Sequence, residues 1–308
     1  MSSISQLKQK MGWMKDRPDI RDFSTTTNRV SKTLLRMGKT ETVKQMVNSI
    51  QNSAKKPAKL PVSKDLRPGC SPIEDQESIG SCCAHAVSGM LEFMQKKAFG
   101  TYTDASRLFL YKVMRKMLHW TGDTGCYLRT AMGSLAVFGA PPEEYWPYDI
   151  SQYDAEPSVF AYAYAQNFQA ISYYRLDPLG TTPAKALDNI KEHIGSMGIP
   201  VIFGFSCYDS LQHAETGATG NIPFPETTES NIGGHAIVAV GYDDKKEITH
   251  PVSGTVTKGA LIIRNSWGTS WGEAGYGYLP YEYVLSELAD DFWVMLKNEW
   301  IETDLFKQ

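Results

Sequence analysis

The sequence has little net charge, no internal repeat and no apolar run long enough to cross a membrane. No stretch reaches about 18 consecutive apolar residues, so we expect no membrane span. A net charge of −3 over 308 residues gives no general attraction to nucleic acid. The N-terminus lacks the apolar core of a standard secretory signal, so we expect a cytoplasmic protein or one exported by a non-standard route.

Cysteine is scarce, with five in the whole chain. An odd and low count does not indicate a disulfide framework, and it suits a reducing compartment with at least one free thiol. The histidines show no spacing typical of a metal site, so we expect neither a metal ion nor another cofactor. The cysteines are Cys70, Cys82, Cys83, Cys126 and Cys207.

What the sequence does contain is ordinary globular material, 42% hydrophobic and 21% charged, with a basic segment before an acidic body. Residues 24–60 carry eight basic residues against one acid, a balance of +7, which leaves −10 for the rest. Apolar residues recur in this segment at roughly helical spacing, and Gly38 separates two short predicted helices. The segment is either a solvated arm or one that docks by charge on the acidic body and covers its cleft.

Helix-like patterns come first along the chain, and strand-like patterns come later. Helical periodicity predicts helices over 81–97, 104–118, 127–138 and 183–197. Short β-rich runs predict strands at 201–205, 235–242, 260–265, 276–279 and 292–296. This order favours an α+β fold with two lobes.

Cys82 follows the loop residues Gly80 and Ser81 and begins the first of these helices. A thiol at a helix N-terminus lies beside the positive end of the macrodipole, which lowers its pKa and favours the reactive thiolate. Gln76 lies six residues earlier, so the loop can fold back and place its amide beside the sulfur. There it would hold an oxyanion together with the backbone N–H of Cys82. The alternative, commoner for a cysteine taken alone, is a buried inert thiol.

Two later segments offer partners for that thiol. His235 follows two glycines at the start of a strongly apolar strand, where a lone histidine is usually structural. Asn265 ends another strand, and Trp267 follows it. An asparagine side chain can accept from one imidazole nitrogen and turn the other toward a nucleophile. A tryptophan beside that hydrogen bond would exclude water from it.

Together the three segments resemble the papain family of cysteine peptidases, and the stretches GWMKDRPDIRDF, DLRPGCSPIEDQ and ATGNIPFP further resemble its prokaryotic branch. The resemblance rests on Gln76 with Gly-Ser-Cys ending six residues on, GGHAIVAVGY around His235, and NSWGTSWGEAGY from Asn265. Cys82 and His235 are 153 residues apart in the sequence, close to the roughly 130–150 typical of the family. The match runs over about residues 65–296.

Three departures from the family pattern surround the nucleophile. Ile79 stands where papain-type plant and lysosomal enzymes have a cysteine, so the disulfide of that cysteine is missing, which agrees with a reducing compartment. Glu77 replaces a glycine and puts a charge near the cleft. Cys83 replaces a tryptophan. The spacing from Gln76 assigns the reactive role to Cys82 and leaves Cys83 to packing.

The resemblance implies a papain-like two-lobe fold, with a helical lobe, a β-barrel-like lobe and the active-site cleft between them. We expect residues 1–62 to be an N-terminal extension or prosegment, 63–166 the helical lobe with the nucleophile, and 167–308 the β-rich lobe. The predicted catalytic residues are Cys82, His235, Asn265 and Gln76, and the predicted substrate-binding residues are Gly125, Gly234 and Trp267.

The resemblance further implies an endopeptidase that attacks peptide bonds through a Cys82 thioester, without a cofactor. Its partners would be a polypeptide substrate and its own N-terminal segment as an intramolecular inhibitor, in a monomer that binds neither nucleic acid nor membrane. Residues 24–60 are the better inhibitory candidate, whereas GWMKDRPDIRDF would pack permanently on the body. Deubiquitinase-like specificity stays open. So do two other functions, a thioester-using acyl transferase and a catalytically silent papain-like binding protein.

Overall fold

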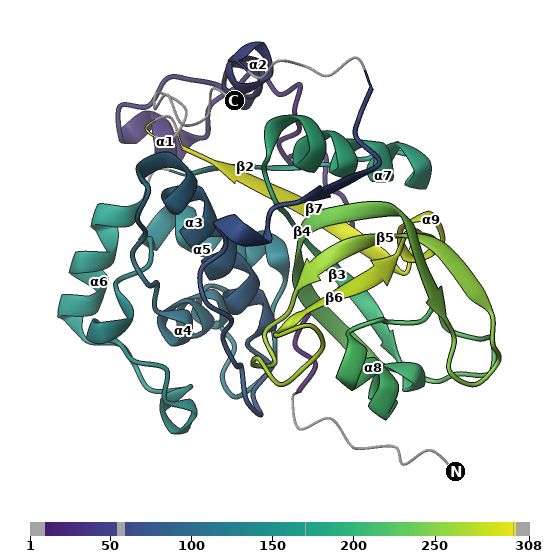
Figure 1. Cartoon of the computed structure of the whole chain (residues 1–308). Coiled ribbons are helices and arrows are strands. Elements are labelled where there is room, and N and C mark those ends of the chain that lie inside the picture. The colour runs from purple at the N-terminus through teal and green to yellow at the C-terminus, as the bar shows by residue number, and fades with distance from the viewer. Residues whose placement is uncertain (1–9, 54–58, 170, 298, 300–308) are drawn as a thin grey trace.

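The computed structural model describes residues 10–53, 59–169, 171–297 and 299. Helices gather on one side of the molecule, and an antiparallel sheet curls on the other (Figure 1). No helix in these ranges has the length and apolar character needed to span a membrane. The helices are α1 (Lys32–Arg36), α2 (Val43–Ser53), α3 (Cys82–Phe99), α4 (Arg107–Met117), α5 (Leu128–Phe138), α6 (Val159–Ala165), α7 (Pro183–Glu192), α8 (Ala214–Thr219) and α9 (Tyr281–Leu285). The strands are β1 (Ser63–Asp65), β2 (Ser172–Arg175), β3 (Val201–Tyr208), β4 (Asn231–Thr249), β5 (Val256–Arg264), β6 (Tyr276–Pro280) and β7 (Ala289–Leu296).

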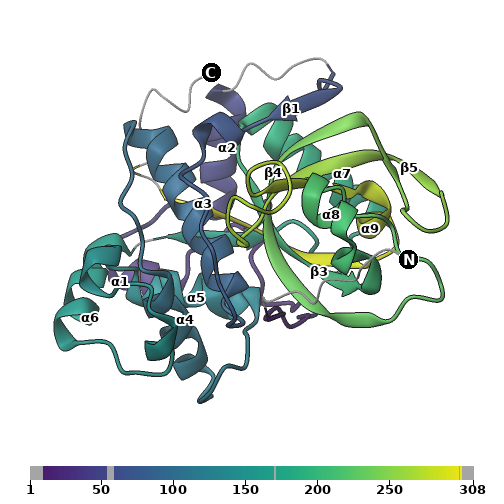
Figure 2. The ribbon, with the colours of Figure 1, turned by 60° about the horizontal axis from the view of Figure 1, so that its bottom comes forward.

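Helix α3 stands between helices α4 and α5 on one side and the sheet on the other (Figure 2). Most of its side chains are buried, so it is enclosed nearly all round. It begins at Cys82 and ends before Gly100, which takes the left-handed conformation with φ 74°. Helices α4 and α5 pack against α3, so the helices predicted over 81–97, 104–118 and 127–138 are all present.

The sheet orders its strands as β2-β7-β3-β4-β5-β6, with β1 paired to β4, and the paired strands are antiparallel. The long strand β4 contacts α3 while it pairs with β3 and β5. Its register places His235 opposite Phe205 of β3 and Val238 opposite Arg264 of β5. Each predicted strand overlaps one of β3 to β7, and the predicted α+β class is confirmed.

Several short elements have no counterpart among the sequence predictions. Strands β1 and β2 and helices α6, α8 and α9 are too short for a periodic apolar pattern to stand out. The helix predicted over 183–197 ends at Glu192, and a π-helical turn, His193–Met197, continues it. Gly198, in the left-handed conformation, then stops that turn.

The basic segment, residues 24–60, is anchored by the apolar face of helix α2. Helix α2 buries Val43, Met46, Val47 and Ile50, each no more than 4% exposed, and it contacts β2 and the turn His193–Met197. Burial of four such side chains is worth about 6–12 kcal/mol by the area rule. This part of the chain therefore belongs to the folded body.

Candidate active site

Cys82 occupies the first position of α3, where the preceding loop turns into the helix. Its side chain is fully buried, and its Sγ accepts a hydrogen bond from the backbone N–H of Ala236 on β4, at 3.5 Å. Burial by itself raises the pKa of the thiol. The neighbouring Cys83 thiol and the imidazole and charge of His235 nevertheless hold that pKa well below its ordinary value. Cys82 is therefore a thiol that its surroundings favour as thiolate.

His235 lies on β4 beside Cys82, and Asn265 holds its ring. Nε2 of His235 is 2.7 Å from Oδ1 of Asn265. The same oxygen accepts from the backbone N–H of Ser266 at 2.8 Å, so it is an acceptor and Nε2 carries the proton. The other ring nitrogen, Nδ1, is buried and makes no hydrogen bond in the structure, so it is the one left for the Cys82 thiol.

Trp267 covers the imidazole. Its ring stacks on His235 with centroids 4.6 Å apart and an interplanar angle of 28°, and Trp271 packs edge-on against Trp267 at 5.4 Å. Trp267 itself is buried. This position suits a residue that keeps water from the histidine, whereas its direct contact with substrate stays a prediction.

Gln76 lies in the loop before α3 with its side chain fully buried. Its Oε1 accepts from the hydroxyl of Ser266 at 2.7 Å, so Nε2 is the donating end. Nε2 donates to the carbonyl of Ile79 at 2.9 Å and to the carbonyl of Lys10 at 3.0 Å. The loop therefore folds back on itself, and its amide points at a main-chain carbonyl from the N-terminal segment.

Cys83 turns away from the reactive position. Its thiol donates to the carbonyl of Cys126 at 3.3 Å, and burial, together with the neighbouring Cys82, raises its pKa well above the ordinary value. Burial also raises the pKa of Cys126 to about 12. All five cysteines are free thiols. Within the described residues, no cluster of histidine, cysteine and acidic side chains could hold a metal ion.

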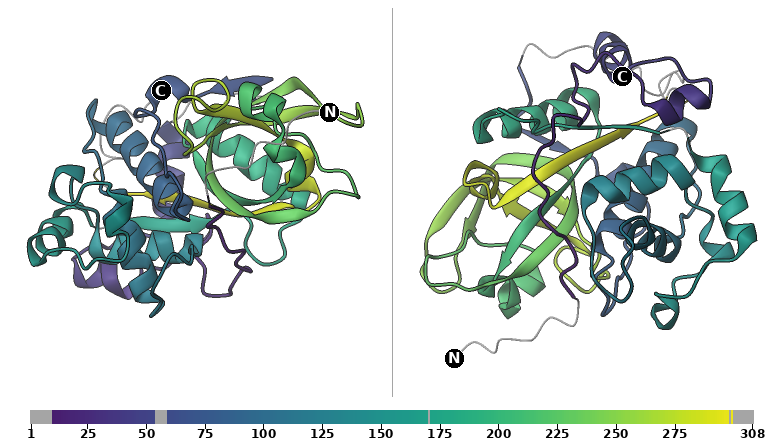
Figure 3. Two further views of the ribbon diagram at one scale, coloured as in Figure 1. Left: turned by 90° about the horizontal axis from the view of Figure 1, so that it is seen from below. Right: turned by 180° about the vertical axis from the view of Figure 1, so that it is seen from behind.

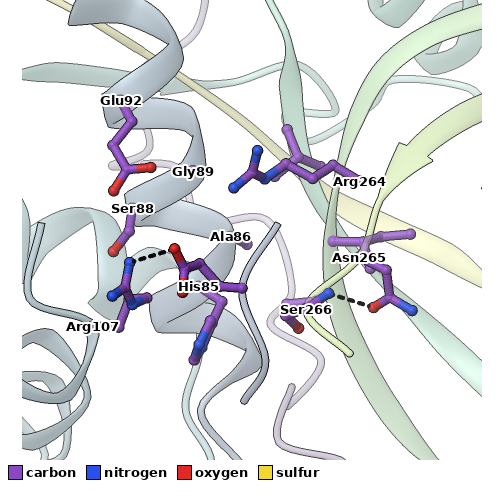
Figure 4. Close-up of a pocket in the computed structure, with 13 residues that line it drawn as sticks. His85, Ala86, Ser88, Gly89, Glu92, Arg107, Arg264, Asn265 and Ser266 are labelled. Carbon is purple, nitrogen blue, oxygen red and sulfur yellow. Dashed lines mark hydrogen bonds and ion pairs between the residues drawn. The ribbon is translucent and has the colours of Figure 1, made fainter. Parts of the chain in front are cut away.

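His85, also on the first turns of α3, is no competitor for His235. Its Nδ1 donates to the carbonyl of Ser81 at 3.1 Å, and burial lowers its pKa to about 3. Figure 4 shows it in a polar layer between α3 and the end of β5, where Arg264 and Asn265 lie opposite. A neutral, buried ring of this kind fits a structural role.

Comparison with known proteins identifies the family. Residues 60–300 match the model of the papain family cysteine proteases, which is more than half of the chain. This chain belongs to the papain family of cysteine proteases. Such proteases are hydrolases that act on peptide bonds, so the enzyme class predicted from the sequence is confirmed.

Two papain-family relatives cover nearly the whole chain. An uncharacterized peptidase C1-like protein of Acanthamoeba polyphaga mimivirus is 31% identical over 295 residues, which span 94% of this chain and 88% of the viral protein. Xylellain, a cysteine protease from Xylella fastidiosa, has a TM-score of 0.70 and 30% identity, over 96% of this chain and 99% of its own. This structural likeness confirms the predicted papain-like fold.

Other papain-family members match over less of their length. Cathepsin K of Mus musculus is 26% identical over 209 residues, which are 68% of this chain but only 56% of the cathepsin. The chain thus spans about half the length of such relatives. The match to the family model begins at residue 60, so what precedes it is described from this structure alone.

Residues Lys10–Met14, which precede the papain-family match, lie across the site. They run through the junction between the helical side and the sheet, at the start of the purple segment in Figure 3 (right). The carbonyl of Lys10 is the one that Gln76 contacts. A main-chain carbonyl from the N-terminal region therefore accepts the hydrogen bond of the Gln76 amide in this papain-family site.

Backbone hydrogen bonds hold this segment on both sides. On the helical side, the carbonyl of Gly12 accepts from the N–H of Cys126 at 2.8 Å, and the N–H of Met14 donates to the carbonyl of Cys126 at 3.1 Å. On the sheet side, the N–H of Trp13 donates to the carbonyl of Gly234 at 2.9 Å. The segment lies in the groove as an added extended chain, a common way to bind a peptide.

The predicted substrate contacts Gly125 and Gly234 both lie against this segment. A Cβ at Gly125 would come within 2.3 Å of the carbonyl oxygen of Gly12. A Cβ at Gly234 would come within 2.6 Å of the carbonyl oxygen of Trp13. Glycine at these two positions lets another main chain approach closely.

The prediction that residues 24–60 cover the cleft is wrong for the part of that range that the structure describes. Helix α2 docks elsewhere on the body because its apolar face, not its charge, decides where it packs. Residues 54–58 lie outside the described residues. The residues over the site are Lys10–Met14, part of which belongs to GWMKDRPDIRDF, the stretch predicted to pack on the body.

Sequence reasoning missed two residues at the site, Trp13 and Asp291. Nε1 of Trp13 donates to Oδ2 of Asp291 at 3.2 Å, and both side chains are buried. Each residue has a weak signal in the sequence. Trp13 is a tryptophan in a polar stretch, and Asp291 is an acid at the start of an apolar strand. Neither signal indicates the other, because 278 residues separate them.

Proposed function

We propose that this papain-family chain is a cysteine endopeptidase with Cys82 as nucleophile and His235 as its acid and base. Gln76 donates to the oxyanion, and Asn265 positions His235. The observation that carries the proposal is the peptide carbonyl of Lys10, which occupies the Gln76 donor in a site whose thiol has a lowered pKa. A substrate carbonyl in the same place would meet the nucleophile.

The reaction follows from these roles. The Cys82 thiolate adds to the carbonyl carbon of a peptide bond, and negative charge moves to the carbonyl oxygen. Gln76 Nε2 and the backbone N–H of Cys82 donate to that oxygen, and loss of one such donor typically costs about 10²–10³ in kcat. Protonated His235 gives its proton to the leaving amine, and a thioester forms. Water that gives a proton to His235 then hydrolyses the thioester and restores the thiolate.

Residues Lys10–Met14 act as the intramolecular inhibitor of this enzyme. Two observations support this role, the complete burial of Cys82 and His235 and the contact of the segment with Gln76. The same segment passes along the groove rather than ending in it, which suits cleavage within a polypeptide.

Activation then requires the segment to leave while the chain after it stays attached. Arg129 holds Asp22 through two hydrogen bonds of 2.8 Å, and the N–H of Arg175 donates to the carbonyl of Phe23 at 2.7 Å. The chain after Phe23 is fixed by the buried apolar face of helix α2. Displacement of residues 10–14 is therefore enough to open the groove without loss of the folded arm.

Intact-mass measurement after treatment with an epoxysuccinyl thiol inhibitor tests the proposal. The full-length protein should label slowly. Trp13→Ala removes packing worth about 3–5 kcal/mol from the closed form and should speed labelling by about a hundredfold or more. Met14→Ala is the matched control on the same segment, because Met14 is 36% exposed, and it should change the rate by less than about threefold.

Two further variants locate the chemistry. Cys82→Ala should abolish the adduct, and Cys83→Ala should keep it. With Trp13→Ala, hydrolysis of a denatured protein in the presence of an added amine separates water from amine as the acyl acceptor. An adduct on Cys83, or none in any variant that keeps a folded circular-dichroism spectrum, would refute the assignment of Cys82.

A further inference from the structure

The slot that Trp13 fills is flat and has a polar end. The indole lies against Gly204 and Gly234, where a Cβ would come within 1.9 Å and 2.6 Å of its ring atoms. Trp13 is 6% exposed, and its Nε1 donates to Oδ2 of Asp291. Two glycines thus leave room for an aromatic ring, and a carboxylate receives the hydrogen-bond donor of that ring.

Asp291 is fixed by neighbours that leave one oxygen for the slot. Its Oδ1 accepts from Nε1 of Trp293 at 2.7 Å and pairs with Nη1 of Arg175 at 2.9 Å. Its Oδ2 accepts from Trp13. Asp291 and Arg175 are both buried, and Arg175 also donates two hydrogen bonds to Asp177, so one guanidinium is shared by two carboxylates.

A substrate side chain can reach this slot. The residue whose side chain fills it, Trp13, pairs through its own backbone with Gly234, next to the proposed base His235. Trp13 is three residues from Lys10, whose carbonyl lies on Gln76. An extended chain advances about 3.3 Å per residue, so a residue within about three positions of the attacked carbonyl reaches the same slot.

We propose that Asp291 makes this slot select tryptophan in the substrate, at one position within three residues of the attacked carbonyl. The inference rests on the proposed function, because it assigns the substrate preference of that same site. The preference follows because the indole N–H of tryptophan complements the acceptor Oδ2 of Asp291. A site built to accept a hydrogen bond rejects an analogue that lacks the donor, since its buried acceptor is then left unpaired.

The same contacts predict which side chains are disfavoured. Phenylalanine and leucine fill apolar space but offer no donor to Oδ2 of Asp291. Arginine offers donors but has no aromatic ring to lie against Gly204 and Gly234. Tryptophan combines a flat ring with a neutral donor, as the side chain now in the slot does.

The test uses the full-length Trp13→Ala protein, in which the slot is empty. We would measure kcat/KM at about pH 8, because burial raises the pKa of Asp291 to about 7. The substrates are quenched fluorescent peptides with tryptophan, phenylalanine, leucine or arginine at each of three positions on either side of the cleaved bond. One position should prefer tryptophan over phenylalanine by about tenfold, the value of a hydrogen bond to a charged group.

Asp291→Asn in the same protein is the matched change. Asparagine keeps the shape and tolerates the left-handed φ of 64° at this position. It replaces the charged acceptor by a neutral one, so the ratio of tryptophan to phenylalanine should fall to about threefold or less. The ratio within each protein is the readout, so a change in overall rate does not affect the conclusion.

A binding measurement keeps the inference separate from catalysis. N-acetyltryptophanamide and N-acetylphenylalaninamide would be titrated into the Trp13→Ala/Cys82→Ala protein, with and without Asp291→Asn, and the melting temperature followed. A preference for the tryptophan amide that Asp291→Asn removes supports the slot, even if no peptide is cleaved and the proposed function fails. Active enzyme with equal ratios for tryptophan and phenylalanine, or equal binding of the two amides, overturns the inference and leaves the proposed function intact.

Discussion

The side-chain amide of Gln76 donates a 3.0 Å hydrogen bond to the main-chain carbonyl of Lys10, 66 residues earlier in the chain. The donor that an oxyanion would need is therefore occupied in the closed form. His235 and Asn265 are nevertheless already hydrogen-bonded, and His235 already lowers the pKa of Cys82. The inhibition that we propose therefore works by competition for the groove and not by misalignment of the reacting groups. Opening and chemistry can accordingly be changed by different substitutions.

Arg129→Ala should make the closed form easier to open. Arg129 holds the chain that directly follows residues 10–14, through an ion pair with Asp16 and a 2.8 Å hydrogen bond to the carbonyl of Arg17. Because the group is partly exposed, we expect a modest effect, about a fivefold faster labelling of Cys82 by the epoxysuccinyl inhibitor.

Arg21→Ala is the control for that variant. Arg21 pairs with Asp19 on the same stretch, but its side chain is 85% exposed and the pair joins neighbouring residues. Labelling should stay within about twofold of the unchanged protein. If the two arginine variants label at the same rate, the contacts of Arg129 do not hold the segment.

The reacting groups that we propose could be picked out from the sequence because each lies in a local motif. The Gly-Ser before Cys82, the glycines before His235 and the aromatic loop after Asn265 each record a short piece of backbone geometry. Their order along the chain then joined them through the resemblance to the papain family. The main helices and strands were also readable, since they are long enough to show apolar periodicity.

The covering segment could not be predicted, because its contacts are non-local. Charge counting favoured residues 24–60, yet four apolar side chains of α2 outweigh the charges of that arm and dock it elsewhere. The contact of Trp13 with Asp291 depends on strand β7 reaching the groove beside β3. One sequence contains no signal for such a pairing, and only the folded chain places the two residues together.

Gln76→Ala should reduce kcat far more than it changes KM, measured on the Trp13→Ala protein with a quenched peptide. The side chain donates to a carbonyl whose charge develops only in the transition state, so we expect a loss of about 10²–10³ in kcat. Gln76→Glu is the matched variant, since it keeps the oxygen that accepts from Ser266 but loses the donor. It should be impaired at least as strongly above about pH 6, where the new carboxylate is ionised. A loss under about threefold in both would remove Gln76 from the chemistry.

Cys83→Ala should raise the pH needed to form the Cys82 thiolate. The thiol of Cys83 is one of the groups that holds the pKa of Cys82 down against burial. Loss of this thiol should move the midpoint of Cys82 alkylation to higher pH. Cys83→Ser retains a donor and should show a smaller shift. The measurement is the rate of iodoacetamide alkylation against pH on the Trp13→Ala protein, and identical midpoints for both variants would contradict the assigned contact.

Asp291 should make folding stability fall as the pH rises from about 4 to about 7. Burial raises the pKa of its carboxyl from 3.8 to about 7 in the folded chain, against the opposing charge of Arg175. Between these values the folded state binds a proton that the unfolded state has released, so the free energy of unfolding is highest at low pH. The slope is at most about 1.4 kcal/mol per pH unit, which amounts to about 1–3 kcal/mol between pH 5 and pH 7.

Asp291→Asn removes the carboxyl that binds this proton. Urea unfolding of the Cys82→Ala protein and of the Cys82→Ala/Asp291→Asn protein, compared at each pH, therefore isolates the effect. The free energy of unfolding should fall less between about pH 5 and pH 7 in the asparagine variant, by about 1–3 kcal/mol. Burial also raises the pKa values of Asp177 and Asp290, but those groups are present in both proteins and cancel in the difference. Equal slopes would mean that Asp291 stays ionised down to pH 5. The pairing with Arg175 would then outweigh burial, and the slot that holds Trp13 would keep its charged acceptor across the whole range.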